Sequence, residues 1–339
     1  MAIRIAVDAM GGDHAPAAIV EGSVLAAREL GHNIILVGRE QEIRRELQRL
    51  GAERDGLELV DAPEVIGMDE PPILGLRRKK HSSIRVAAHL VREGRADGLV
   101  TAGNTGAAMV CSKVVIGTLP GIDRPAVTAI LPNLTGKTVW LDVGANVDSK
   151  PLHILQFAQM GSLYARRILG VESPRVGLLS VGEEEMKGNE LTKVAFRMLQ
   201  EADIRFIGNS EGRDIFNGSC DVIVCDGFTG NVSLKAIESV VEMVAIYLKQ
   251  ELTSSFMARL GMMLAAPAMR RFKRVIDYAE YGGFPLLGVQ SAVIIGHGRS
   301  SPRAVRNAIR ACGEYVSHKV IDRIREVLPQ VAAEAAPVA

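Results

Sequence analysis

The sequence of 339 residues has no large excess of either charge and no long apolar run. Its 40 Lys and Arg residues nearly balance its 39 Asp and Glu residues, so a net charge of +1 gives no overall attraction to nucleic acid or anionic lipid. No apolar stretch reaches the ~18 residues of a spanning helix, and the start lacks the apolar region of a signal peptide. We therefore expect a protein that is soluble or lies on a membrane surface and has no nucleic-acid partner.

Cysteine is also scarce, and its four residues form no C-x-x-C pair. Their valine neighbours favour buried, reduced thiols, which fits a reducing cytoplasm. The seven His residues show no metal-ligand spacing, so neither a metal nor another cofactor is expected. The cysteines are Cys111, Cys220, Cys225 and Cys312.

Familiar nucleotide and hydrolase motifs are missing as well. The segment NLTGKT at 133–138 ends like a phosphate-binding P-loop, but Leu131 stands where the first glycine should be, and a strand pattern follows it. No G-x-G-x-x-G leads from a strand into a helix, and no G-x-S-x-G occurs. A dinucleotide site and acyl-enzyme chemistry are therefore disfavoured, and 132–136 is expected to be a hairpin turn.

Short β-type runs alternate with helical patterns of ten or more residues, and 47% of the residues are apolar. This alternation predicts an α/β fold with a mainly parallel sheet covered by helices on both faces. The runs at 126–131 and 138–143 are joined by a short turn, which predicts an antiparallel hairpin and hence a mixed sheet. The other runs are 3–7, 33–37, 57–60, 98–101, 175–180, 221–225 and 292–295.

Five of these strands end in loops that combine glycine with Asn, Asp, Thr or Lys. Glycine lets the backbone approach a ligand, and a helix that opens next presents free amides to an anion. Each loop alone could be an ordinary turn, but the five together favour a binding site in one cleft. The loops are 8–14, 103–106, 142–146, 182–189 and 226–231.

With these loops side by side, the sequence resembles the acyl-ACP:phosphate acyltransferase (PlsX) family. The matching segments follow one another in order over nearly the whole chain. They are VDAMGGDHAP at 7–16, KHSS at 80–83, TAGNTGA at 101–107, LDVGAN at 141–146, GEEEMKGNEL at 182–191, DGFTGN at 226–231, GGFPLLGV at 282–289 and HGRSS at 297–301.

The resemblance implies transfer of a long-chain acyl group from acyl carrier protein to inorganic phosphate, for phospholipid synthesis, by a homodimer. It implies a three-layer α/β/α fold like that of isocitrate dehydrogenase and phosphotransacetylase, formed by residues 1–330 around an interlobe cleft. Residues 331–339 are expected to be a frayed tail. Rival interpretations are a coenzyme A-dependent phosphotransacylase of short acids, a non-catalytic membrane scaffold and, third, a nicotinamide-dependent dehydrogenase.

This reaction needs no nucleophile from the protein, because phosphate is itself an oxyanion and a thiol with pKa near ~8.5 leaves readily. The protein must hold phosphate against the thioester and stabilise the tetrahedral oxyanion. The catalytic candidates are Lys187, His14, Asp13 and Asn104. The phosphate-binding candidates are Asn104, Thr105, Gly106, Ser82 and Ser83, and the two serines are equally well explained as helix N-caps. The substrate-binding candidates are Asn146, Asp142, Asn189, Asp226, Thr229 and Asn231, of which the two aspartates could instead cap turns.

Apolar residues at helical spacing between 252 and 276 predict an inserted amphipathic helical pair over 245–280, interrupted at Pro267. Its expected tip at 260–269 combines Met and Leu with nearby Arg and Lys, which suits an anionic membrane, acidic carrier protein or a dimer core. The resemblance implies a cytoplasmic protein bound peripherally to the inner face of the cell membrane. Its product would pass to a membrane glycerol-3-phosphate acyltransferase. The basic run 77–80 is a second candidate for carrier-protein docking.

Overall fold

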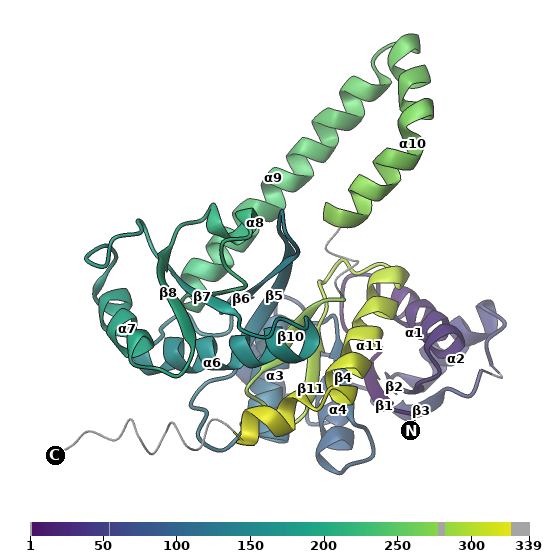
Figure 1. The fold of residues 1–339 in the computed structure, drawn as a ribbon. Coiled ribbons are helices and arrows are strands. Elements are labelled where there is room, and N and C mark those ends of the chain that lie inside the picture. Colours follow the sequence, from purple (N-terminus) through teal and green to yellow (C-terminus); the bar gives the residue numbers. More distant parts are fainter. Residues whose placement is uncertain (1, 54, 277–281, 327–339) are drawn as a thin grey trace.

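A single sheet of eleven strands runs through the computed structural model, which describes residues 2–53, 55–276 and 282–326 (Figure 1). The strand order is β3-β2-β1-β4-β11-β10-β5-β6-β9-β7-β8. The strands are β1 Arg4–Asp8, β2 Asn33–Gly38, β3 Glu58–Asp61, β4 Gly98–Thr101, β5 Ala126–Pro132, β6 Lys137–Leu141, β7 Arg175–Leu179, β8 Arg205–Ser210, β9 Val222–Val224, β10 Phe284–Leu287 and β11 Ala292–Ile295.

Strand direction divides the sheet into two halves. β3, β2, β1, β4 and β11 are mutually parallel, and β6, β9, β7 and β8 are mutually parallel. Three antiparallel junctions lie between the halves, at β11/β10, β10/β5 and β5/β6, so the two halves run in opposite directions. The expected mixed, mainly parallel sheet is therefore confirmed, and so is the 126–141 hairpin.

Helices cover both faces of the sheet, which confirms the three-layer α/β/α architecture. Alternate strand residues face opposite layers, because successive side chains in a strand point to opposite sides. Ile5 and Val7 belong to the core cluster that also contains buried residues of α1, α6 and α11, whereas Ala6 belongs to the cluster that contains those of α4 and α5. The helices are α1 Ala17–Leu30, α2 Glu40–Arg49, α3 Pro72–Arg78, α4 Ser83–Arg92, α5 Thr105–Cys111 continued by a π-helical turn Ser112–Ile116, α6 Pro151–Ile168, α7 Glu190–Gln200, α8 Asp214–Asn217, α9 Gly227–Thr253, α10 Phe256–Ile276 and α11 Pro302–Ser317.

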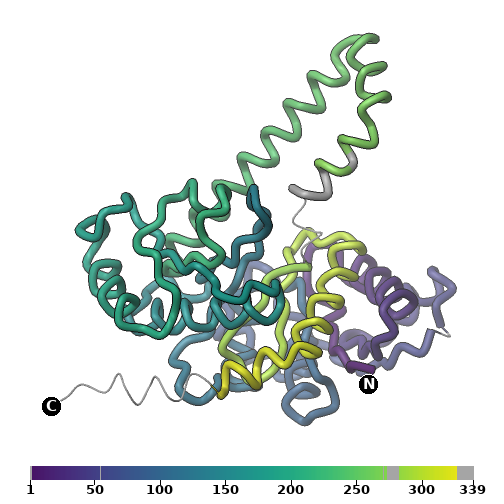
Figure 2. The backbone as a smooth tube through the Cα atoms, in the orientation of Figure 1, coloured from purple at the N-terminus to yellow at the C-terminus, as the bar shows by residue number. Residues whose placement is uncertain are grey.

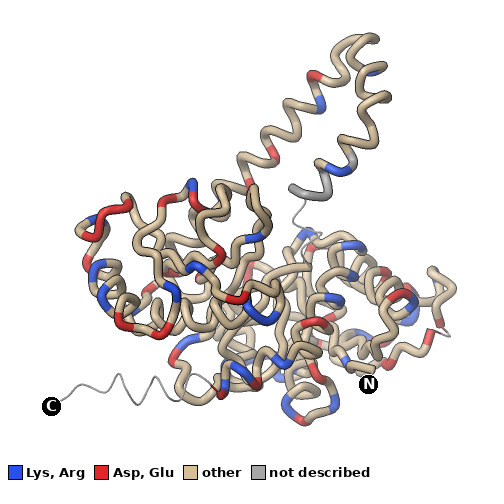
Figure 3. Tube along the Cα trace, viewed as in Figure 1, with Lys and Arg blue, Asp and Glu red and all other residues tan. Residues whose placement is uncertain are grey.

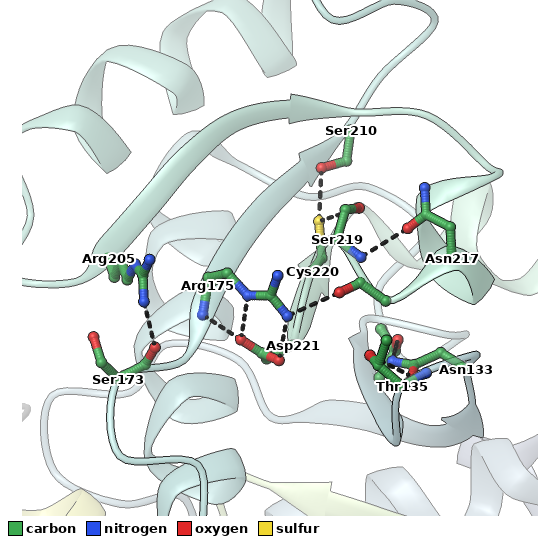
Figure 4. A network of polar contacts seen from close by, with 12 residues as sticks. Asn133, Thr135, Ser173, Arg175, Arg205, Ser210, Asn217, Ser219, Cys220 and Asp221 are labelled. Carbon is green, nitrogen blue, oxygen red and sulfur yellow. Dashed lines mark hydrogen bonds and ion pairs between the residues drawn. The ribbon is translucent and has the colours of Figure 1, made fainter.

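The half that contains β6 to β9 is tied together by buried and half-buried polar contacts. Arg175 at the start of β7 donates to both carboxylate oxygens of Asp221, at 2.9 Å each, just before β9 (Figure 4). Trp140 in β6 is completely buried and its indole N–H donates to Sγ of Cys225 at 3.2 Å. All four cysteines are free and buried, as the sequence predicts.

The helical pair projects from the body of the protein as two long helices that contact one another (Figure 2). The turn between them lies at Ser254 and Ser255, so the expected break at Pro267 is wrong: Pro267 lies inside α10. Ser255 explains the position, because its Oγ accepts from the N–H of Ala258 and its carbonyl accepts from Arg259, as at a helix start. The side chains at 270 and 273–276 and the tail 331–339 lie outside the described residues.

Candidate functional site

The carboxyl ends of the adjacent strands β1, β4 and β11 form the first cluster of strand-end loops, called here the β1–β4–β11 cluster. At its base the buried Asp8 accepts a 2.8 Å hydrogen bond from the hydroxyl of Thr101 and another from the N–H of Met10. Burial raises the pKa of Asp8, and hydrogen bonds, first among them one from Ser83, oppose that rise. Asp8 thus joins the loop after β1 to β4 and α4.

The two glycines of the first loop are needed for close packing. A Cβ at Gly11 would lie 2.7 Å from the backbone nitrogen of Gly103, and Gly12 has φ of +108°, where side chains are strained. The following residue, Asp13, donates its N–H to the carbonyl of Gly298 at 2.8 Å. The 8–14 loop therefore lies directly against the loops after β4 and β11. The side chains of Asp13 and His14 are exposed at this edge.

Asn104 uses both of its polar side-chain atoms within the protein. Its Oδ1 accepts from the N–H of Ala107 and caps α5, and its Nδ2 donates to the carbonyl of Met68 at 2.8 Å. Nδ2 is also within 3.3 Å of the carbonyl of Gly67 and 3.1 Å of that of Glu70. Asn104 therefore clamps the 67–70 loop to the start of α5, a connection that the sequence did not predict.

Beside that clamp, the N–H groups of Thr105 and Gly106 have no acceptor among the described residues. Ser82 and Ser83 are both buried; Ser83 is committed to Asp8, and the Oγ of Ser82 has no partner among the described residues. The two serines thus lie beneath the cluster. Their contact with phosphate stays a prediction.

His297, the second residue after β11, connects this cluster to α9. Its Nδ1 accepts from the N–H of Arg299 at 3.1 Å, which leaves Nε2 to carry the proton of the neutral ring. Burial lowers the pKa of His297. Of the two nearby charges on α9, that of Glu238 raises this pKa and that of Lys235 lowers it. The sequence contained this residue in its HGRSS segment but gave it no role.

The second cluster lies at the carboxyl ends of β6, β9 and β7, and Asp142 holds it together. This carboxylate is completely buried and accepts from the N–H groups of Val127, Gly144, Ala145 and Asn146 and from the side chain of Asn146. Burial raises the pKa of Asp142 to about 6. Both carboxylate oxygens of Asp142 thus accept hydrogen bonds from backbone N–H groups, which indicates that this residue holds the 142–146 loop in its conformation.

The other candidates of this β6–β9–β7 cluster are mostly helix caps. Asp226 caps α9 by accepting from the N–H and hydroxyl of Thr229, and Asn189 caps α7 by accepting from Thr192. The side-chain amide of Asn146 donates hydrogen bonds to the carboxylate of Asp142 and to the carbonyl of Pro125. Asn231 is exposed, and a Cβ at Gly144 would lie 2.9 Å from its Nδ2.

Lys187 is exposed in the loop after β7, and its stem lies over Gly182, where a Cβ would be 3.1 Å from its Cγ. Four glutamates surround it in the sequence between 182 and 190. The 77–80 run beside the other cluster is basic instead, although Lys79 is paired with Glu70. The two clusters therefore have opposite local charge.

The first turns of α9 separate these clusters. Thr229, Ser233 and Ile237 face a pocket beside the loop that carries Lys187. Lys235 and Glu238, which act on His297, are on nearly the opposite face at 100° per residue. The structure thus unites the candidates in two groups, and a single interlobe cleft common to both stays a prediction.

Comparison with known proteins identifies the family. A family model described as fatty acid synthesis protein matches residues 3–323. A phosphate acyltransferase of Pelotomaculum thermopropionicum is 53% identical over 98% of this chain and 97% of its own length. A phosphate acyltransferase of Heliobacterium modesticaldum is 54% identical over 96% of this chain and 98% of its own length. The chain belongs to the phosphate acyltransferase family. This phosphate acyltransferase is therefore an acyltransferase enzyme of fatty acid and phospholipid synthesis, as the resemblance implied.

A solved structure supports the fold of this phosphate acyltransferase. The EutD phosphotransacetylase from Staphylococcus aureus superposes with a TM-score of 0.59 over 93% of this chain and 94% of its own, at 16% identity. At that identity the likeness concerns the fold alone, and it agrees with the phosphotransacetylase-like architecture expected from the sequence.

The four cysteines are shielded from solvent, and this burial lowers their reactivity. Burial raises the pKa of Cys111 to about 12 and that of Cys312 to about 12, and it raises those of Cys220 and Cys225, so these thiols are poor nucleophiles at neutral pH. No group of three His, Cys, Asp or Glu side chains in the described part of the chain could hold a metal ion. None of the described helices is long and apolar enough to cross a membrane.

Proposed function

We propose that the protein transfers a long-chain acyl group from acyl carrier protein to inorganic phosphate, giving acyl-phosphate and holo-acyl carrier protein. The observation that carries this proposal is the family match, which runs through every strand-end loop of both clusters at about half identity. The acyl-phosphate would pass to a membrane glycerol-3-phosphate acyltransferase.

Direct attack of phosphate on the thioester carbon is the proposed route. It forms the new C–O bond, passes through a tetrahedral oxyanion and expels the thiolate of the carrier protein's pantetheine arm, which then takes up a proton. The raised pKa values of all four cysteines support this route over a cysteine acyl-enzyme. Binding, orientation and oxyanion stabilisation then remain as the tasks of the protein.

Phosphate would bind at the β1–β4–β11 cluster. The free N–H groups of Thr105 and Gly106 support this assignment. Asn104 would not touch the anion; it would hold these N–H groups in place by joining the 67–70 loop to the start of α5. Asp13 and His14, exposed at the same edge, are the proposed orienting and proton-donating groups. Lys187, on the loop after β7, is the proposed cationic clamp on the same phosphate.

The thioester substrate, meaning the pantetheine arm and the acyl group attached to it, would lie along the β6–β9–β7 cluster. Asn231 is the proposed contact for the oxyanion or the pantetheine amides, because its side chain is exposed and makes no hydrogen bond to another side chain among the described residues. Asp142, Asn146, Asn189, Asp226 and Thr229 would shape this arm's path by holding their loops and helix starts.

Two surfaces of the helical pair carry the remaining partner proposals. Val240, Ile246 and Tyr247 on α9 are 54%, 51% and 61% exposed, and we propose that they pack in a homodimer. Met263 and Leu264 on α10 are 71% and 79% exposed and would enter the inner face of the cell membrane. All charged residues between 256 and 272 of α10 are basic (Figure 3), which suits contact with an anionic membrane surface.

Phosphate-dependent consumption of palmitoyl-acyl carrier protein tests the function, with acyl-phosphate trapped by hydroxylamine. Palmitoyl-coenzyme A and acetyl-coenzyme A are run in parallel. Strict dependence on phosphate and preference for the carrier protein are expected. Preference for acetyl-coenzyme A would identify a short-acid phosphotransacylase, and no turnover of any thioester would favour a scaffold.

A further inference from the structure

A cavity lies between the end of β7, α8 and the first turns of α9. Its volume is about 740 Å³, within the range of ordinary ligand sites. Its apolar lining includes Phe216 from α8 and Ile237 from α9. The lining residues are Leu179, Ser180, Val181, Gly188, Asn189, Thr192, Gly212, Ile215, Phe216, Asp226, Thr229, Ser233, Ala236 and Ile237.

This cavity is poorly suited to phosphate. None of the described residues that line it is Lys, Arg or His, and its one charged group is the carboxylate of Asp226. Asp226 and Asn189 direct their side-chain oxygens to helix caps, so these acceptors are already occupied. The neighbouring loop adds Glu183 and Glu184, whose charge disfavours a second anion. What remains for a ligand is largely apolar surface.

The cavity is also elongated along α9. On that helix the lining includes Thr229, Ser233 and Ile237, which are four residues apart and together span ~12 Å of helix axis. Side chains at i, i+4 and i+8 lie along one face of a helix and so form a continuous wall. An extended, uncharged chain fits such a wall better than a compact polar group.

We propose that this cavity holds the acyl chain of the thioester substrate, with Phe216 and Ala236 limiting the length that fits. The proposal rests on the proposed function, because it assigns a place to the hydrocarbon part of that substrate. The chain's tail lies against α8 and α9, and its thioester end leaves the cavity beside Gly188, next to Lys187.

Ala236→Phe fills the cavity without disturbing a packed core, since Ala236 is exposed on α9. Each methylene that loses its buried position weakens binding about fourfold, so displacing two lowers kcat/KM for palmitoyl-acyl carrier protein about 15-fold. Hexanoyl-acyl carrier protein has a chain too short to reach the added ring, so none of its methylenes is displaced and its kcat/KM stays within about twofold. Ala236→Ser adds a hydroxyl but no ring, so as the size control it should lower kcat/KM for palmitoyl-acyl carrier protein much less than Ala236→Phe does.

Phe216→Ala gives the opposite change, because it lengthens the cavity. The backbone of Phe216 keeps its hydrogen bonds to Arg213 and Leu134, so α8 stays in place. We expect the ratio of stearoyl to palmitoyl turnover to rise. Equal loss for all chain lengths in Ala236→Phe would instead assign the cavity to the pantetheine arm and overturn the proposal, as would no loss for any.

A binding measurement separates this proposal from the proposed function. Pyrene-labelled dodecanol, an uncharged chain that needs no turnover, should bind the wild-type protein and Ala236→Ser but bind Ala236→Phe at least tenfold more weakly. Unchanged binding in Ala236→Phe overturns the acyl-chain assignment. Chain binding with no turnover of any thioester would keep the assignment and reject the proposed function.

Discussion

Replacing Asn104 with Asp separates the two tasks of this side chain at the start of α5. Asp keeps an oxygen that accepts from the N–H of Ala107, but it loses the amide that donates to the carbonyls of Gly67, Met68 and Glu70. An amide has two N–H groups, so the loss is about two net hydrogen bonds, or about 1–3 kcal/mol of unfolding free energy. Repulsion between the new carboxylate and those carbonyls adds to it.

The assay combines thermal unfolding with the KM for phosphate. A 339-residue chain has an unfolding entropy of about 0.7 kcal/mol/K, so the melting temperature should fall by about 1.5–4 °C. The KM for phosphate should rise, because 67–70 would no longer support the start of α5. Asn104→Ser, which can cap the helix without a charge, is the control and should lose less stability. An Asn104→Asp protein that melts at the wild-type temperature would refute the clamp, and an unchanged phosphate KM would refute its link to phosphate.

Four further results are expected. Lys187→Ala should lose most of its turnover while melting normally, and a variant that retains its rate would remove the cationic clamp. His14→Asn should lower the rate at unchanged melting temperature if His14 donates the proton. The pKa of Asp142, raised to about 6 by burial, lies above its unfolded value of 3.8, so its stabilising contribution is complete below pH 4 and is lost as the pH rises through 6. The unfolding free energy of wild type minus that of Asp142→Asn should therefore fall by about 3 kcal/mol between pH 4 and 7, and a flat difference would contradict this. The double variant Met263→Glu, Leu264→Glu should lose binding to anionic vesicles and keep the dimer intact, whereas a monomer or an aggregate would assign this part of α10 to the dimer interface.

The sequence predicted nine of the eleven strands, because those nine are apolar runs bounded by turns. β8 was missed since it is an edge strand whose first residues alternate between exposed and half-buried, and it carries Gly208 and Asn209. β10 was missed since Pro285 argues against a central strand. The structure accommodates that proline where the strand changes partner, pairing with β11 through Phe284 and Pro285 and with β5 through the next two residues.

The side-chain partners at the clusters were less predictable. Glycine and capping residues identified the loops correctly as helix starts, as Asn104, Asn189 and Asp226 now show. Composition could not reveal that Asn104 reaches back 34 to 37 residues to the 67–70 loop, or that Asp142 gathers the whole 142–146 loop. These contacts depend on how distant segments meet.

The division into two clusters has a specific cause in the sheet. Loops of similar composition follow strands that run in opposite directions, because three antiparallel junctions lie between β11 and β6. The sequence predicted only the last of these junctions, and two of the three involve the missed strand β10. Without β10, the relative direction of the two halves of the sheet could not be derived from the sequence.

Helix α9 is the element that can join the two clusters in one reaction. It starts at Asp226 within the β6–β9–β7 cluster, faces the apolar cavity with Ser233 and Ile237, and brings the charges of Lys235 and Glu238 to His297 in the other. It then continues into the projecting pair. A membrane or dimer contact on that pair would therefore change the position of the same helix that lies between both clusters. Variants at Met263 and Leu264 should for this reason be assayed for turnover as well as for binding.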